Sequence, residues 1–191
     1  NIDLIYGVND NIDIVKKDID YFLSIDIPHI SCYSLIIEDN TLLKINNYQN
    51  IDEDIEYEMY KYIENKLTSN GYIHYEISNY AKEGYSSIHN INYWDNGSYY
   101  GFGLGSVSYI DNYRISNTKN ISKYNKGIYI SNREYEDMNT NMSNDMILGL
   151  RKIKGVSISK FYNKYKKDIR EVFDIDDLIK DKLLIIDNDN I

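Results

Sequence analysis

Short apolar runs alternate with amphipathic stretches over residues 2–77, and this alternation constrains the fold more than any other feature of the sequence. Residues 2–6, IDLIY, are mostly apolar and predict a buried strand. Residues 12–25 repeat apolar side chains at spacings of three and four, which predicts an amphipathic helix. Residues 29–37, HISCYSLII, are apolar almost throughout and predict a second strand.

The same alternation continues through a polar loop expected at residues 38–50. Residues 52–69 have an apolar stripe at helical spacing, with acidic residues at the start and Gly71 just beyond the end, which predicts a second helix. Residues 72–77 are rich in β-branched and aromatic residues and predict a third strand. Right-handed crossovers turn such a β-α-β-α-β order into a parallel sheet or part of a barrel. Three strands are too few to close a barrel, so we expect a fragment that is incomplete at both ends.

The later part of the chain predicts different structure. Residues 97–110 are Gly-rich and then strand-like, and residues 111–117 predict a further short strand after a turn. Residues 118–140 are polar and weakly periodic, which predicts a connecting segment with one short helix. Residues 141–191 predict three short helices followed by a strand at 183–187. We therefore expect three parts: 1–117, 118–140 and 141–191.

Composition excludes several classes of function. The 191 residues have a formal net charge of −9 and no cluster of Lys or Arg, which argues against a nucleic-acid partner. No apolar run approaches the roughly 20 residues that a membrane span needs. The single cysteine, Cys32, rules out a disulfide framework within the chain and favours a reducing compartment. We expect a cytoplasmic location, and we interpret Cys32 as an inert core residue.

A predicted strand followed by a loop dense in His, Asn and aromatic residues marks the candidate site. The expected loop carries His89, Asn90, Tyr93 and the only tryptophan, Trp94. A neutral imidazole beside aromatic rings is suited to ligate heme iron while the rings pack on the porphyrin. The alternative is that His89 and Asn90 hold the loop in place and Trp94 belongs to the core.

Three neighbouring motifs give the chain a family resemblance. HNINYW at 89–94, with HYEISNYA before it and GFGLG after it, resembles the radical SAM heme chaperones (HemW) and the related oxygen-independent coproporphyrinogen III oxidases (HemN). The resemblance runs from Asp3 to about Ile185. It implies an α/β fold: the C-terminal part of a partial (βα)6 radical SAM barrel, followed by a small, mostly helical, winged-helix-like domain.

The resemblance implies a heme chaperone that binds heme and delivers it to apoproteins. The alternatives are an oxidase that decarboxylates coproporphyrinogen III in porphyrin biosynthesis, and an inactive fragment. The implied cofactors are S-adenosylmethionine, heme and a [4Fe–4S] cluster. In the family a preceding half supplies the Cys-x3-Cys-x2-Cys loop for the cluster; here Cys32 stands alone, so the chain lacks the cluster ligands.

The resemblance also implies residue roles, while the catalytic residues remain unknown. The motif HNINYW is associated with heme binding in the chaperones, and it implies heme contacts for His89, Asn90, Tyr93 and Trp94. Residues Asp3, Ile5 and Ile36 match positions that contact S-adenosylmethionine. Asp3 would hydrogen-bond a polar part of this ligand, and the two isoleucines would flank its adenosine. The alternatives are core packing for Ile5 and Ile36, and a turn at the end of a strand for Asp3.

The chain departs from the family pattern at two places. The family commonly has GLPxQT after the first strand, whereas this chain has GVNDN, with Asn11 shorter than Gln. The family often has a His at the position of Val107. The glycines of GFGLG are expected to allow close backbone approach, because a phosphate loop would lead into a helix.

The remaining polar residues of interest lie near the predicted strands. Glu76 and Asn79 end the third strand, where catalytic residues cluster in barrel folds. A solvated carboxylate is the alternative for Glu76. His29 and His74 lie at strand starts, and we interpret both as structural.

Overall fold

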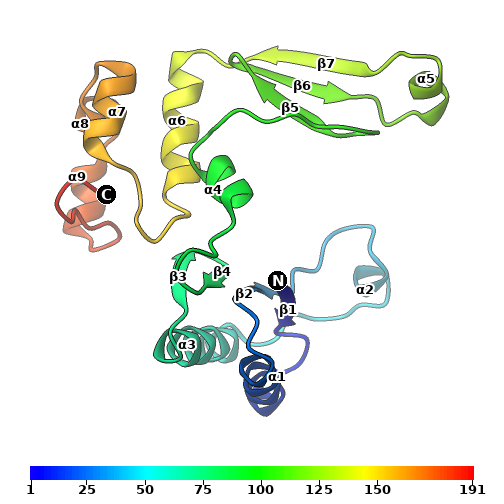
Figure 1. Ribbon diagram of the computed structural model, residues 1–191, viewed down its shortest axis with the longest axis vertical. Helices are drawn as coiled ribbons and strands as arrows, with labels where there is room; N and C mark the ends of the chain where they lie inside the picture. Colours follow the sequence, from blue (N-terminus) through cyan, green and yellow to red (C-terminus); the bar gives the residue numbers. More distant parts are fainter. The chain divides into compact units, whose positions relative to one another are not determined.

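The computed structural model covers residues 1–191 and divides into two compact units, Asn1–Ser86 and Ser87–Ile191 (Figure 1). We call them the N-terminal and the C-terminal unit. Each has its own hydrophobic core. One cluster of buried residues runs from Tyr6 to Tyr80, and the other runs from Met142 to Ile191.

The N-terminal unit contains a four-stranded sheet with the order β1-β2-β4-β3. Strands β1 (Ile2–Tyr6) and β2 (His29–Ser34) are parallel, as predicted. Strand β3 (Ile73–Glu76) is not the neighbour of β2, because β4 (Asn79–Ala81) is inserted antiparallel between them. The prediction of three adjacent parallel strands was therefore wrong. The cause is a tight reversal after Glu76, which returns the chain along β3.

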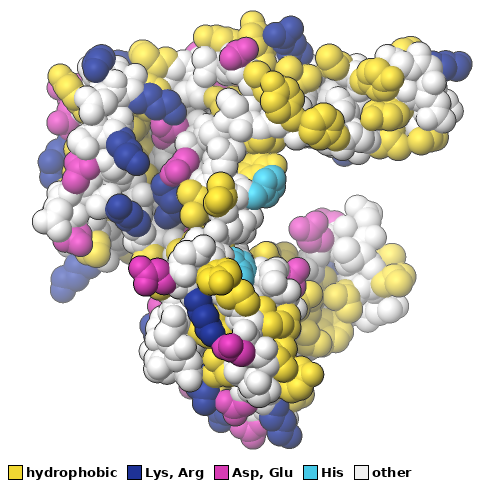
Figure 2. All heavy atoms as spheres, in the orientation of Figure 1, with side chains coloured by type: hydrophobic (Ala, Val, Ile, Leu, Met, Phe, Trp, Pro, Cys, Tyr) yellow, Lys and Arg dark blue, Asp and Glu magenta, His cyan; other side chains and the backbone are white.

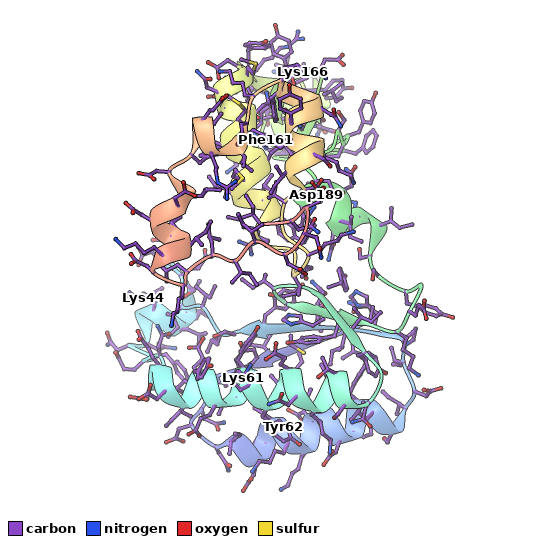
Figure 3. All side chains as sticks on the ribbon, turned by 90° about the vertical axis from the view of Figure 1, so that its left-hand side faces the viewer. Lys44, Lys61, Tyr62, Phe161, Lys166 and Asp189 are labelled. Carbon is purple, nitrogen blue, oxygen red and sulfur yellow. The ribbon has the colours of Figure 1, made fainter.

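Two helices cover one face of this sheet. Helices α1 (Ile12–Ser24) and α3 (Glu53–Ser69) lie side by side beneath it, and α2 (Leu42–Ile45) is a single turn within the predicted loop (Figures 1 and 3). The side chains between helices and sheet are almost fully enclosed and include Ile19, Phe22, Ile30, Met59, Ile63, Leu67 and Tyr80. Burying each large apolar side chain contributes about 1.5–3 kcal/mol to the free energy of unfolding, so the contact between the helices and the sheet stabilises the unit.

Side-chain caps define where these two helices begin. The Asn11 side chain accepts a hydrogen bond from the Asp13 amide at 3.0 Å, and Asp52 does the same for the Asp54 amide at 3.0 Å. Asn11 is therefore engaged locally as a helix cap.

The C-terminal unit begins with a helix and a three-stranded antiparallel sheet. Helix α4 (Ile88–Trp94) precedes strands β5 (Val107–Ile110), β6 (Tyr113–Asn117) and β7 (Ile130–Tyr135). The predicted turn between β5 and β6 is confirmed, with positive φ at Asp111 and Asn112.

Strand β7 corrects the interpretation of residues 118–140 as a connection with one short helix. The helix is present as α5 (Ile121–Asn125), but β7 pairs along β6. All six residues of β7 are exposed, so no alternation of buried and exposed side chains marked it in the sequence. The division of the chain into three parts at these boundaries stays a prediction.

Four helices form the rest of the C-terminal unit: α6 (Met138–Gly149), α7 (Ile158–Tyr165), α8 (Ile169–Val172) and α9 (Ile175–Lys180). The mostly helical character predicted for this region is confirmed. The strand predicted at 183–187 is absent, and the segment makes only isolated bridges near its end. Leu184 and Ile186 pack against the helical core while Leu183 and Ile185 are exposed, and this alternation explains why the segment resembled a strand.

Candidate ligand-binding site

A row of polar side chains crosses the N-terminal sheet on the face opposite the helices. Asp3 pairs with Ser31, Ser31 with Asn79, and Asn79 with Glu76, so the row spans all four strands. Directly paired residues project to the same side of a sheet. We call Asp3, Ser31, Asn79 and Glu76 the polar row.

The end of the polar row on β4 and β3 has unmet hydrogen-bonding capacity. Glu76 is 0% and Asn79 3% exposed, and the Asn79 Nδ2 donates to Glu76 Oε1. The other two oxygens, Glu76 Oε2 and Asn79 Oδ1, are enclosed and have no partner. A solvated carboxylate is therefore excluded for Glu76. Leaving a buried acceptor unsatisfied costs about 1–3 kcal/mol and more for a charged group, so the pair fits a ligand that donates hydrogen bonds.

Core packing was the alternative for Ile5 and Ile36, and a turn at the end of a strand was the alternative for Asp3. The structure contradicts both. Asp3 lies within β1 rather than in a turn, and it accepts a hydrogen bond from Asn1 Nδ2 at 2.7 Å. Ile5 and Ile36 are 55% and 75% exposed, so neither belongs to the core. Ile5 lies on the same face as Asp3, two residues along β1.

Ile36 differs from its prediction in one respect. Strand β2 ends at Ser34, so Ile36 lies beyond the strand rather than at its end. Strands β1 and β2 are parallel, and their carboxyl ends share one edge of the sheet. Ile5 lies near the carboxyl end of β1, and Ile36 follows the carboxyl end of β2, so both belong to the same edge of the sheet.

The two histidines of this unit hold the sheet together. His29 Nε2 contacts the Tyr75 hydroxyl at 2.7 Å, which ties β2 to β3, and burial lowers the pKa of His29. His74 stacks on Tyr80 with ring centroids 4.3 Å apart, on the helix-covered face. Both contacts agree with the structural interpretation of these residues.

The motif HNINYW at residues 89–94 lies in helix α4 rather than in the predicted loop. Ser87 caps the helix by accepting a hydrogen bond from the Asn90 amide at 3.2 Å, and residues 88–94 contain no Gly or Pro to interrupt it. The Ser and Asn residues of this stretch resemble a loop by composition, but Ser87 acts as a helix cap here.

Helical geometry divides the four residues matched to heme between two faces. His89 and Tyr93 are one turn apart, and their rings meet edge to face with centroids 4.7 Å apart. Tyr93 in turn contacts Tyr99 at 4.4 Å between centroids. Asn90 and Trp94 lie about 100° further round the helix. The structure therefore groups His89 with two tyrosines and places Trp94 on a different face.

His89 is available for a ligand. Its side chain is exposed and makes no hydrogen bond, so both ring nitrogens lack a protein partner. Trp94 is only partly buried, and the Arg151 guanidinium lies 4.7 Å from its ring centroid. The interpretation that His89 holds a loop in place is wrong, because it is exposed on a helix.

The Gly-rich segment serves close packing. The Gly101 amide donates to Ser108 Oγ at 2.9 Å, and a Cβ atom on Gly101 would lie 2.3 Å from the Val107 carbonyl oxygen. The segment leads into strand β5 rather than into a helix. The prediction that these glycines allow close backbone approach is confirmed for Gly101, whereas Gly103 and Gly105 have positive φ and no backbone atom within 4 Å of a Cβ position.

Cys32 does not fit a [4Fe–4S] cluster. Burial raises the pKa of its thiol to about 12, which disfavours the thiolate that ligates iron. No group of three or more His, Cys, Asp or Glu side chains is arranged to hold a metal ion.

Two residues of these sites were missed in the sequence. Ser31 is polar at an alternate position of an otherwise apolar strand, and that period of two was the available signal. Tyr99 is one of 21 tyrosines and lies outside any periodic pattern, so nothing in the sequence distinguished it.

The comparisons with known proteins agree with both the fold and the motifs. Residues 139–191 match the HemN C-terminal domain family. The heme chaperone HemW of Lactococcus lactis is 38% identical over 200 residues, which cover 100% of this chain and 53% of that protein. The HemW of Bacillus subtilis is 34% identical, covering 91% of this chain and 48% of the relative. The chain thus spans about half the length of these relatives.

A solved structure extends the agreement to the fold. The coproporphyrinogen III oxidase HemN from Escherichia coli, described as a radical SAM enzyme, matches with a TM-score of 0.80 and 13% identity. The match covers 99% of this chain and 50% of that one. The α/β fold is therefore that of a radical SAM protein, as the motifs predicted. More narrowly, the chain belongs to the family of the HemW heme chaperones and HemN oxidases.

None of the helices combines the length and the apolar character that crossing a membrane would require.

Proposed function

We propose that the protein containing this chain is a heme chaperone, which binds heme and delivers it to apoproteins. The observation that carries the proposal is the exposed imidazole of His89, with both nitrogens unpartnered, against the ring of Tyr93. The names of the relatives support it, since those from Lactococcus lactis and Bacillus subtilis are called heme chaperones. A heme-protein recipient and a cytoplasmic location belong to the same proposal.

The residues of α4 fit heme in a specific way. The neutral imidazole of His89 would ligate the iron, and Tyr93 and Tyr99 would contact the apolar porphyrin face. Trp94 lies on a different face of the helix from His89, so it would meet the porphyrin only at its edge. The heme roles of Asn90 and Trp94 stay predictions.

We extend the proposal to S-adenosylmethionine at the N-terminal sheet. Asp3 and the unpartnered oxygens of Glu76 and Asn79 are acceptors, which suit the ammonium and hydroxyl donors of this cofactor. Ile5 and Ile36 are exposed apolar side chains suited to flank a flat adenine. The cofactor would supply radical chemistry only with a cluster, for which this chain has no fitting ligands.

Heme titration of the full-length protein tests the main proposal. Wild type should give a saturable Soret band, and His89→Ala should weaken or shift it. The matched control is Ile88→Ala, which truncates the neighbouring, 84% exposed side chain of the same helix and should leave the band unchanged. An identical Soret band and affinity in His89→Ala would remove His89 from the heme site.

A second assay separates the chaperone from the oxidase. The reconstituted full-length protein is supplied with coproporphyrinogen III and S-adenosylmethionine. We expect no protoporphyrinogen IX, together with transfer of bound heme to an apoprotein. Formation of protoporphyrinogen IX would contradict the chaperone proposal and favour the oxidase.

A further inference from the structure

The C-terminal unit contains a pocket that shares only Trp94 with the residues matched to heme. It has a volume of about 240 Å³ and lies where the end of α4 meets α6 and α7. Trp94 and Phe161 contribute aromatic surface, and three lysines, Lys152, Lys160 and Lys164, line it. Figure 2 shows several Lys and Arg side chains over this part of the unit, although the whole chain is acidic.

Both acidic residues of the pocket are already neutralised. Asp95 forms an ion pair with Lys152. Asp145 is bound by Lys164 Nζ through both oxygens, at 3.0 and 2.8 Å, and also accepts a hydrogen bond from Asn96 at 2.9 Å. The pocket lining therefore has no unpaired carboxylate to attract a cation, and Lys160 is its one lysine without an ion pair.

The groups left without a partner are both donors. Lys160 forms no ion pair or side-chain hydrogen bond, although it lies near enough to Asp189 to contribute slightly to the lowered pKa of that carboxyl. The Trp94 indole Nε1 is enclosed and has no hydrogen-bond partner. Lysine and tryptophan side chains can only donate, so a group that satisfies them must accept hydrogen bonds and favour a positive environment.

The rest of the pocket wall is apolar and tightly built. Phe161 projects from α7 (Figure 3) and is 2% exposed, and Val156 closes the wall beside Gly149. A Cβ atom on Gly149 would lie 2.4 Å from Val156 Cγ2, so glycine permits this close approach. A purely polar anion would leave the aromatic surface without a contact, whereas a flat apolar ligand would cover it.

We propose that this pocket binds a carboxylate carried on a flat apolar body, with Lys160 and the Trp94 indole as the carboxylate donors. Two sources share this chemistry: a free aromatic acid, and the propionate-bearing edge of heme. The proposal does not depend on heme ligation by His89, because neither His89 nor Tyr93 lines the pocket.

Trp94 provides the measurement, since it is the only tryptophan of the chain. Benzoate is titrated into the 191-residue chain with tryptophan fluorescence as the readout, and benzamide serves as the uncharged probe of the same shape. We expect a saturable change with benzoate and binding at least about tenfold weaker for benzamide. Lys160→Gln should weaken benzoate about tenfold, because a charge-assisted hydrogen bond is lost. Lys154→Gln removes the same charge outside the pocket and should have no effect.

A second arm identifies the source. Heme and heme dimethyl ester, which lacks free carboxylates, are titrated into wild type and Lys160→Gln. Weakening of heme but not of its ester by Lys160→Gln would support the propionate edge as the source. If Lys160→Gln weakens the binding of benzoate but leaves the affinity for heme unchanged, a free aromatic acid is the supported source. The proposal is overturned if no carboxylate response depends on Lys160 in either arm, whatever His89→Ala does to the Soret band.

Discussion

The two units leave opposite hydrogen-bonding capacity unmet. In the N-terminal unit the unpartnered buried groups are acceptors, Glu76 Oε2 and Asn79 Oδ1, held by strand pairing. In the C-terminal pocket the unpartnered groups are donors: the enclosed Trp94 Nε1 on α4 and the exposed Lys160 ammonium on α7. The first unit therefore suits a ligand rich in N–H or O–H groups, and the second suits an anion. This contrast teaches that the two candidate sites differ in chemistry, because each is built within its own unit.

The largest expected effect tests whether the two cores are separate. Met59 and Met142 are 0% and 1% exposed and lie in different cores. Truncation to Ala should lower the free energy of unfolding by about 2–5 kcal/mol in each case, because it leaves a cavity. Hydrogen exchange should show faster amide exchange in residues 1–86 for Met59→Ala and in 87–191 for Met142→Ala. Equal acceleration throughout by either variant would show one cooperative core.

The substitution Glu76→Gln, which keeps the side-chain shape, tests the site formed by the unpartnered oxygens of Glu76 and Asn79, the acceptor site. Glu76→Gln retains an oxygen for Asn79 Nδ2 and removes the unpartnered acceptor Oε2, so we expect the free energy of unfolding to rise by about 1 kcal/mol. Binding of S-adenosylmethionine by the full-length protein should weaken at least about tenfold in calorimetry. Glu64→Gln, on the helix-covered side of the unit, is the control for charge. Unchanged cofactor affinity in Glu76→Gln would remove the polar row from the site.

The smallest effect concerns pH. Burial lowers the pKa of His29, so the folded protein keeps this imidazole neutral while the unfolded chain protonates it below about pH 6.5. His29 therefore contributes stability that is present above pH 6.5 and is lost as the pH falls toward the lowered value. Denaturant unfolding at pH 7.5 and 5.5 should show this loss, and His29→Asn should reduce it. An equal pH dependence in the variant would assign the effect to other groups.

Periodicity in the sequence predicted the parts of the fold that bury one continuous face. Strand β1 and helices α1 and α3 match their predicted ranges closely, because each carries an apolar stripe against the core. Strand β4 was missed because three residues are too few to show a period. Strand β7 was missed because its pairing is made by the backbone, with every side chain exposed.

The candidate sites were predicted by residue type but not by geometry. The motif located His89, Asn90, Tyr93 and Trp94, whereas only the helical twist of α4 separates Trp94 from the His89 face. The burial of Glu76 depends on a register across four strands, which no local pattern encodes. Lys160 and Lys164 lie one turn apart on α7, a spacing visible in the sequence, whereas no local pattern places Lys152, from the segment after α6, and Trp94 of α4 beside them.

The insertion of β4 between β2 and β3 has a consequence for the order of folding. Strand β4 pairs with β2, which lies far earlier in the chain, and places Ala81 opposite His29. The two ends of the long segment between these residues must therefore meet before the pairing forms. The Glu76–Asn79 pair takes its place in the polar row only after that step. We therefore expect the local β3–β4 reversal to form before the complete row, so a ligand that needs all four strands would bind only the fully paired sheet.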